Sequence, residues 1–566
     1  MEYLHLFKTK TEHDSFYNGN KYKEPWLAYT RDNTLVTGNK SYEYYRNEYL
    51  TLSALEDGEI TITVPSNVNA TYATSLSYSK DKSNWIPTTI DDTDQTITIQ
   101  VSSGEDVYLK GKAKQWFGLD GEVGMNIAVS ANFNVSGNIM SLLYDNDFKD
   151  KTTFPDESAF TFAFLFAGNI YLKNAENLIL PATTLVPYCY GVMFYNCSSL
   201  TAAPALPATK LDYSCYEGMF YDCSALTTAP ALPATTFAPS CYSSMFRGCT
   251  ALTAAPKLPA TTLAEKCYYE MFSSCTSLTT TPKLPATTLA SSCYNSMFQD
   301  CTSLETAPEL PAITLAESCY SGMFNGCISL TAAPQLLATT LVNSCYYRMF
   351  SGCSSLTTAP NLPATTLAES CYSNMFYGCT SLATAPELPV TTLATFCYSK
   401  MFYGCTSLAT APALPATTLA LRCYQYMFQD CTSLTTSPEL PATELADYCY
   451  HGMFNGCSSL TAAPELPATT LANDCYSYMF QDCTSLETAP ELPATTLASS
   501  CYNRMFYSCK KLNNITMLAT NVSASSCLYN WVSGVASTGT FTKAASMTSL
   551  PTGINGIPSG WTVVNK

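Results

Sequence analysis

The sequence has few basic residues, few histidines and no long apolar run. Its 28 Lys and Arg stand against 44 Asp and Glu, which gives a formal net charge of −16. Because nucleic acids and anionic membrane surfaces attract a basic face, this balance argues against both as the main partner. No window reaches the roughly 18 consecutive apolar residues that a membrane span needs, so we expect no membrane insertion.

The sequence also lacks the marks of a secretory signal and of a catalytic centre. Its first residues, MEYLHLFKTK, contain no basic stretch followed by an apolar core, so no signal peptide is visible. The three histidines are His5, His13 and His451, and His451 falls at a variable position that we expect to face outward. No Ser-His-Asp or Cys-His set and no glycine-rich phosphate loop can be assembled. We therefore expect no enzyme, no catalytic residue and no cofactor.

What the sequence has in abundance is cysteine in a repeat. All 27 cysteines fall in two columns with a period of 26 residues, the first running from Cys189 to Cys527 and the second from Cys197 to Cys509. A fixed period of this size is typical of a solenoid. The two cysteines of one unit lie eight residues apart, which is too far for a disulfide along one helix and is not a zinc spacing. We interpret the thiols as reduced core side chains and expect no metal.

One repeat unit reads LPATTLAxxCYxxMFxxCxSLxxxPx. At about 100° per residue, Cys189, Met193 and Phe194 share one arc and the variable positions fill the other, so the pattern predicts a short amphipathic helix. The other half, such as residues 303–311, is rich in Thr and Pro, which predicts a short strand. The predicted fold class is an α/β repeat solenoid with one short strand and one short helix per 26-residue rung, preceded by a small all-β sandwich.

The motif MFxxCxSL followed by LP resembles the BspA-type leucine-rich repeats of bacterial surface proteins, including their 26-residue variety, over roughly residues 155–530. The resemblance implies a right-handed, leucine-rich-repeat-like solenoid that binds proteins or surfaces without catalysis. It also implies that the ligand surface is the strand face of the solenoid, and it supplies no ligand.

The chain outside the repeat divides by pattern. Residues 59–64 and 95–101 alternate with a period of two, and residues 107–110 follow a turn, so all three are predicted strands of a small Ig-like sandwich. The predicted regions are 1–50, an N-terminal attachment segment; 51–130, the β-sandwich; 131–180, an N-terminal solenoid cap; 181–509, the leucine-rich-repeat solenoid; and 510–566, a C-terminal cap.

The N-terminus, with Leu6 to Thr9 and Tyr22 to Trp26, resembles the start of fibre-like virion proteins from phages of gut Bacteroidetes. This resemblance implies that the N-terminal region contacts other virion proteins and that the chain lies on the virion surface. The alternative is a BspA-like adhesin on a bacterial cell surface. Fibres are often homotrimers, but the sequence shows no coiled coil, so the oligomeric state stays open.

One position of the strand half varies between repeats, namely the residue between Pro and Leu. Alanine occupies it at residues 205, 231 and 413. Elsewhere it reads Lys257, Lys283, Glu309, Gln335, Asn361, Glu387, Glu439, Glu465 and Glu491. Two interpretations are open: a solvated stripe of screened charges, or a candidate ligand face for a host or cell-surface protein or glycan. On the second interpretation, the charge of the face changes from basic to acidic along the stack.

Overall fold

The computed structural model describes residues 28–29, 35–36, 42–64, 73–88, 95–113, 125–155 and 159–566. The chain forms two compact units, Met1–Pro259 and Ala260–Lys566, which we describe separately. Both N-terminal segments that resemble phage fibre proteins lie outside the described residues.

The first unit begins with strands and ends in repeat rungs. It contains β1 (Ala28–Tyr29), β2 (Leu35–Val36), α2 (Tyr42–Arg46), β3 (Leu50–Ala54), β4 (Gly58–Val64), β5 (Ala73–Ser79), β6 (Ile86–Thr88), β7 (Gln95–Val101), β8 (Asp106–Ala113), β9 (Asn126–Val129), β10 (Phe133–Asn138), α3 (Ser141–Tyr144), the short 3-10 helix η1 (Asp145–Asp147), β11 (Leu172–Asn174) and β12 (Leu178–Ile179). The three predicted strands are therefore present, as β4, β7 and β8.

Most of these strands belong to two sheets. One has three antiparallel strands in the order β7-β4-β9, and the other has the order β11-β10-β3-β8-β5-β6 with β12 also pairing with β10. Strand β10 pairs antiparallel with β3 on one side and parallel with β11 and β12 on the other, so the sheet continues into the first rungs. A separate all-β domain before the solenoid is therefore not confirmed, because β10 has a pairing edge on each side and joins the two regions.

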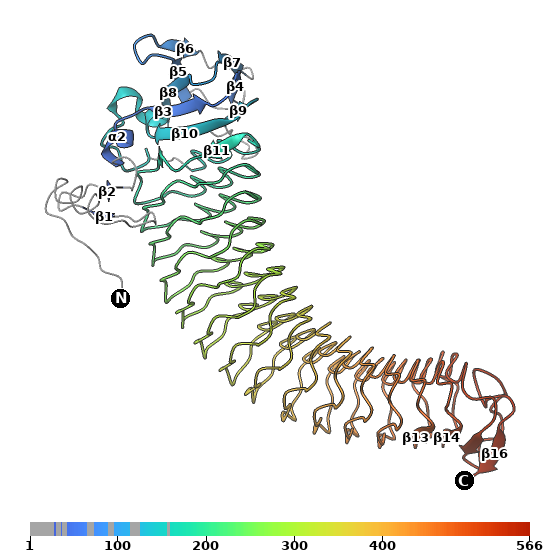
Figure 1. The fold of residues 1–566 in the computed structure, drawn as a ribbon. Coiled ribbons are helices and arrows are strands. Elements are labelled where there is room, and N and C mark those ends of the chain that lie inside the picture. The colour runs from blue at the N-terminus through green and yellow to red at the C-terminus, as the bar shows by residue number, and fades with distance from the viewer. Residues whose placement is uncertain are drawn as a thin grey trace. The chain divides into compact units, whose positions relative to one another are not determined.

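The second unit consists of stacked 26-residue rungs followed by a terminal sheet (Figure 1). Its strands are β13 (Thr488–Leu492), β14 (Asn514–Met517), β15 (Thr540–Lys543) and β16 (Thr562–Asn565), all paired in parallel in that order. Beyond the last Cys-Tyr-x-x-Met-Phe rung, Trp531 is fully buried, and its indole N–H donates to the carbonyl of Gly556 at 2.9 Å. Large buried aromatic rings thus cover the apolar end of the stack.

The cysteine-bearing half of each rung contains no helix, so the predicted helix is wrong. We call this half the turn segment, for example residues 370–379. Alternate amides bond back within the rung, as from Met375 to the Tyr372 carbonyl at 3.1 Å. The amides between them bond to the next rung, as from Phe376 to the Met401 carbonyl at 2.9 Å. In an α-helix all amides bond along the helix axis and none is left for a neighbouring rung. In the turn segments, some amides bond within the rung and the others bond to the next rung.

The backbone of the turn segments explains why the sequence suggested a helix. Residues with positive φ recur every fourth position, for example Ser370 at 54°, Asn374 at 58° and Gly378 at 71°. The buried pairs Cys-Tyr and Met-Phe follow the same period of four. A period of four differs from the helical 3.6 by only about 10° per residue, so over one short segment both periods keep the core residues on one side.

Because Ser370 has a positive φ, we expect that its replacement by glycine stabilises the protein, whereas glycine usually destabilises it. Ser370→Gly should raise the free energy of unfolding by about 1 kcal/mol, because glycine adopts this conformation without a Cβ clash. Ser370→Val should lower it by about 1 to 2 kcal/mol. Urea denaturation measures both changes. Ser381, in the same rung but without positive φ, is the control, and there glycine should be the destabilising residue. If glycine changed the free energy of unfolding equally at Ser370 and Ser381, the turn geometry described here would be contradicted.

The core consists of side-chain columns that run from rung to rung. In each Cys-Tyr-x-x-Met-Phe rung of the second unit, that Tyr, the Met-Phe pair and the Leu three residues after the second-column cysteine are almost fully buried, together with both cysteines. The rings stack on those of the next rung, as Phe350 does on Phe376 with centroids 5.8 Å apart and planes 7° apart. Second-column thiols donate to the carbonyl of a phenylalanine one rung earlier, as Cys379 does to Phe350 at 3.1 Å. One rung therefore cannot bury its own apolar side and depends on its neighbours.

Candidate binding surface

The strand half of each rung is extended but short. Neighbouring rungs pair through single parallel bridges, as Thr306 with Ala332 and Thr384 with Thr410. Proline interrupts each segment two residues after the bridge and removes an amide from the ladder. Threonine and serine hydroxyls replace some of the missing hydrogen bonds between rungs. Thr331, for example, donates to the carbonyl of Glu305 at 3.5 Å.

The structure places every candidate residue between Pro and Leu on the exposed side of this strand half. We call these nine residues the strand-side row. Glu309 is exposed while Pro308 and Leu310 on either side are buried, as an extended chain with one buried face requires. The same exposure holds at Lys257, Lys283, Gln335, Asn361, Glu387, Glu439, Glu465 and Glu491. Lys257 belongs to the first unit and the other eight to the second.

In the second unit, the register brings members of the strand-side row into line. The bridge partners Thr410, Thr436, Ala462 and Thr488 occupy equivalent positions of successive rungs. Residues three positions further along the chain, among them Glu439, Glu465 and Glu491, therefore follow one another at about the spacing of neighbouring strands, near 4.8 Å. Three carboxylates at that spacing repel one another and favour a cationic ligand.

One end of this acidic run has a partner that the sequence does not indicate. The ammonium group of Lys566, directly after β16, lies 2.5 Å from a carboxylate oxygen of Glu491. Both side chains are about half exposed, so the pair contributes little to stability. It does reduce the negative charge at Glu491, which leaves Glu439 and Glu465 as the stronger electrostatic feature of the run.

The metal-ligating and thiol side chains of the described residues can be located directly. They contain no group of three or more His, Cys, Asp or Glu side chains that could hold a metal ion. All 27 cysteines are free and buried. Burial raises the pKa of Cys197 to about 12 and that of Cys371 to about 11, so these thiols carry no thiolate at neutral pH. In the part of the chain that the structure describes, no helix is long and apolar enough to cross a membrane.

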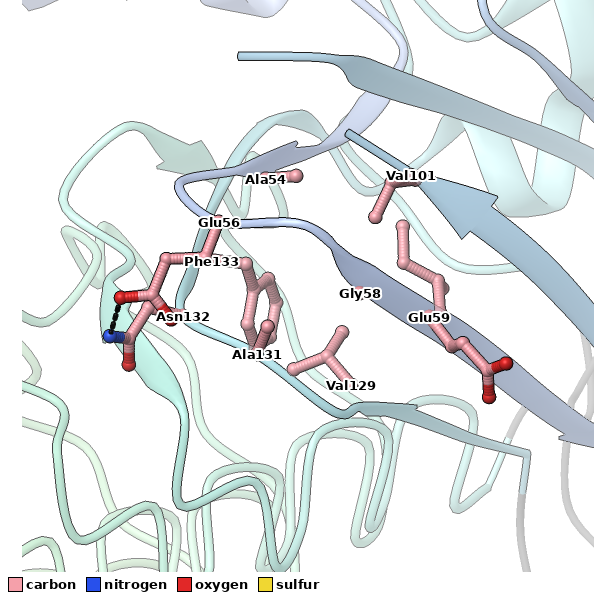
Figure 2. Close-up of a pocket in the computed structure, with 10 residues that line it drawn as sticks. Ala54, Glu56, Gly58, Glu59, Val101, Val129, Ala131, Asn132 and Phe133 are labelled. Atoms are coloured by element: carbon pink, nitrogen blue, oxygen red, sulfur yellow. Dashed lines mark hydrogen bonds between the residues drawn. The ribbon is translucent and has the colours of Figure 1, made fainter. Parts of the chain in front are cut away.

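A small hollow in the first unit is lined mainly by apolar side chains, among them Ala54, Val101, Val129 and Phe133 (Figure 2). At its rim, the Asn132 side-chain amide donates to Glu56 at 2.8 Å. A second acid, Glu59, also lines the hollow, and its carboxylate accepts a hydrogen bond from the Gln100 side-chain amide. The two carboxylates of the lining, Glu56 and Glu59, are thus each held by a hydrogen bond from a side-chain amide.

Comparison with known proteins gives a family match over the repeats. The family described as "BspA type Leucine rich repeat region (6 copies)" matches residues 214–333, 291–435 and 421–535. No curated protein matches the sequence.

Among solved structures, the crystal structure of a TLR13–ssRNA13 complex is similar at 14% sequence identity, with a TM-score of 0.21. The match covers 66% of this chain and 47% of the other, so this chain spans about half the length of that one. At that TM-score the likeness carries no functional argument.

Proposed function

Because the chain belongs to the BspA-type leucine-rich repeat family, we propose that it is a non-enzymatic recognition protein whose repeats present the strand-side row to a protein or surface. One observation carries the proposal. The residue between Pro and Leu changes from rung to rung, while its side chain stays exposed between buried neighbours. Core positions such as Phe and Met do not vary in this way, because packing fixes them. A variable exposed position on a rigid scaffold is where binding specificity can differ from rung to rung.

The acidic part of the row, at Glu439, Glu465 and Glu491, suggests a cationic patch on the ligand. Complementary charges would steer association and fix the register of the complex. Replacing all three by glutamine should weaken binding to the target cells at least tenfold, which corresponds to about 1.4 kcal/mol. Binding of the full chain to whole cells at low and high salt measures this loss, and the salt dependence should shrink with it.

A matched variant separates this effect from net charge. Glu317, Glu369 and Glu444 are equally exposed but lie outside the row, and their replacement by glutamine makes the same change in net charge. This control should bind like the unmodified chain. The proposal fails if both triple variants bind alike, whether both are weakened or both unchanged.

The location of the protein is a further part of the proposal. Proteins with BspA-type repeats are typically associated with surfaces. We place this chain on a phage virion, as a fibre or decoration protein that contacts the host surface or gut matrix, with the alternative of a bacterial cell-surface adhesin. Twenty-seven free thiols suit assembly in a reducing cytoplasm, as virions undergo. Mass spectrometry of purified virions against host outer-membrane fractions separates the two locations.

On this proposal, each region of the chain has its own role. Residues 1–50 would attach the protein to other virion proteins, and residues 181–509 would carry the recognition surface. Residues 51–130 would form the Ig-like module between them, while residues 131–180 and 510–566 would close the two ends of the repeats.

A further inference from the structure

Aromatic rings enclose a titratable side chain at two places that differ in their chemistry. The first is His451, which is only 8% exposed and not outward as expected from the sequence. Its Nε2 atom lies 2.7 Å from the Tyr426 hydroxyl. Burial, and then nearby Arg422, lowers the pKa of His451 to about 4, so the imidazole is neutral. The second is Lys110 in the first unit, and its partners are a carboxylate and a carboxamide.

Lys110 belongs to β8, and its ammonium nitrogen has three close neighbours. The Nζ atom lies 3.0 Å from a carboxylate oxygen of Asp145 and donates to the side-chain carbonyl of Asn146 at 3.1 Å. It also lies 4.3 Å from the centroid of the Trp85 ring. The Lys110 side chain is only 13% exposed. An amine, an acid and an amide from separate parts of the chain therefore meet at one point.

The Asn146 carbonyl oxygen accepts a second hydrogen bond, which the Tyr49 hydroxyl donates at 2.8 Å. The Tyr49 ring packs against the rings of Trp85 and Phe148 at 4.8 and 5.0 Å, which fixes the position of the hydroxyl. Burial, and then the charge of Asp145, raises the pKa of Tyr49, so the hydroxyl keeps its proton. A donor at this oxygen polarises the carbonyl and stabilises negative charge that develops on it.

The backbone at Asp145 is bent so that two consecutive side chains reach the same nitrogen. Its φ is 51° and its ψ is −121°. This ψ lies outside the left-handed helical region, so the conformation is strained for a residue with a Cβ. In an extended segment, the side chains of Asp145 and Asn146 would point to opposite faces. Strain of this kind is typical of positions that serve a function.

We propose that Lys110 and Asn146 form an intramolecular isopeptide bond, with Asp145 as the proton acceptor. Because Nζ already contacts the Asn146 carbonyl oxygen, the carbon that it would attack lies at most one C=O bond, about 1.2 Å, further away. Holding the two groups together replaces a slow reaction between separate molecules by a reaction within one molecule. A lysine amine becomes a nucleophile when an adjacent base removes its proton.

The steps of the reaction balance without an oxidant or a reductant. Asp145 takes a proton from the Lys110 ammonium, and the neutral amine attacks Cγ of Asn146 while the C=O electron pair moves to the oxygen that Tyr49 contacts. Asp145 then gives its proton to Nδ2 of Asn146 and takes a second proton from Nζ. The bond from Cγ to Nδ2 breaks, and ammonia leaves and takes the last proton from Asp145. The products are a secondary amide and one ammonium ion.

The carboxamide distinguishes this contact from the ordinary ion pairs of the chain. Lys80 pairs with Glu105 and Lys566 with Glu491, so each of these lysines faces an ionised carboxylate. An ionised carboxylate resists attack by an amine, because its carbon is electron-rich and it has no neutral leaving group. At Lys110 the carboxylate and the carboxamide are separate groups, so one can accept the proton while the other is attacked.

The bond would connect positions 36 residues apart, across β9, β10 and α3. A pulling force applied between the strands before Lys110 and the rungs after Asn146 would then pass through the isopeptide bond. The residues between the two ends would carry no tension. The cross-link would also remove conformations from the unfolded chain, as a disulfide does. The proposal thus assigns a mechanical role to the region that precedes the repeats.

Mass spectrometry of the full, denatured chain tests the proposal. The mass should be lower than the sequence requires by one ammonia molecule. Trypsin should leave Lys110 uncut and release residues 83–112 joined to residues 115–149. Asp145→Asn should reduce the linked fraction at a fixed time at least about tenfold, because the proton acceptor is lost. Asp147→Asn removes the same charge at an exposed neighbouring position and should form the link like the unmodified chain.

Two further variants separate the chemistry from folding. Tyr49→Phe should slow formation of the link at least about tenfold, because the developing charge on the Asn146 oxygen loses its donor. Lys110→Arg keeps the positive charge beside Asp145 but has no nucleophilic amine, so it should fold without the link. In urea, this variant should unfold at a lower concentration than the linked chain.

Other outcomes would overturn the proposal. A full mass after prolonged incubation at neutral pH would show that the bond does not form. An ammonia loss with the two tryptic peptides separate would indicate a succinimide elsewhere in the chain, and an equal linked fraction in Asp145→Asn would remove the role of Asp145. The inference does not rest on the strand-side row. The Glu439, Glu465 and Glu491 triple variant should form the link unchanged, so either proposal can fail alone.

Discussion

Replacing Phe376 with alanine should lower the free energy of unfolding by about 3 to 5 kcal/mol. Phe376 is fully buried, and its ring stacks between those of Phe350 and Phe402 at 5.8 and 5.7 Å. The substitution therefore removes contacts from two interfaces at once and leaves a cavity that the rigid turn segments on either side cannot close. Chemical denaturation followed by tyrosine fluorescence or far-UV circular dichroism measures the loss.

The location of Phe376 adds a second expected effect. In a stack where each rung contacts only its neighbours, stability is the sum of rung terms and interface terms. Weakening both interfaces of one central rung should split the unfolding of the second unit into two transitions. Phe376→Leu, which keeps most of the volume, should cost less than about 1.5 kcal/mol and preserve a single transition.

The neighbouring residue provides a control. Tyr377 is 38% exposed and touches the ring of Tyr403 at 4.6 Å on the outside of the stack. Tyr377→Ala should change the free energy of unfolding by no more than about 1 kcal/mol. A Phe376→Ala variant as stable as Tyr377→Ala would mean that the phenylalanine column does not join the rungs.

Much of the repeat architecture could be predicted from the sequence. The 26-residue period, the buried columns and the extended strand half all follow from which positions stay constant. The turn segment could not be predicted from the apolar pattern alone, since one segment is too short to distinguish a period of four from the helical period. A second signal was available: the position seven residues after each first-column cysteine is always small or locally hydrogen-bonding, as at Asp300, Gly378 and Ser508. Such residues recurring every four positions indicate positive φ.

The features of the candidate surface also differ in whether the sequence predicts them. The exposure of the strand-side row is local, because Pro and Leu on each side of Glu309 fix which way its side chain points. The pairing of Glu491 with Lys566 depends on how β16 is placed on β15, which no repeat pattern specifies. The burial of His451 likewise depends on Tyr426 and Tyr478, which belong to the rungs before and after it. Contacts between side chains of different rungs therefore cannot be predicted from the sequence pattern of one rung.

The cysteine columns predict that the folded protein resists thiol reagents almost completely. Burial raises the pKa of Cys405 from its ordinary value of 9.0 to about 12. At pH 8 this change alone lowers the reactive thiolate fraction about a thousandfold. The side chain is also inaccessible, and its S–H donates to the Phe376 carbonyl at 3.1 Å. With 27 free, buried thiols, labelling of the native protein should be close to zero and should reach all 27 only after unfolding in denaturant.

An engineered thiol on the strand-side row supplies the reference rate. Glu465 is exposed, so Glu465→Cys should react at the rate of a free thiol while the columns stay protected. Because the buried thiols react only when rungs open, their labelling rate also reports the local opening free energy along the stack. Phe376→Ala should therefore speed the labelling of Cys379 and Cys405 before that of cysteines several rungs away. Rapid labelling of the native columns, or their oxidation to disulfides without unfolding, would show that the sulfurs do not serve as packing and would refute the core described here.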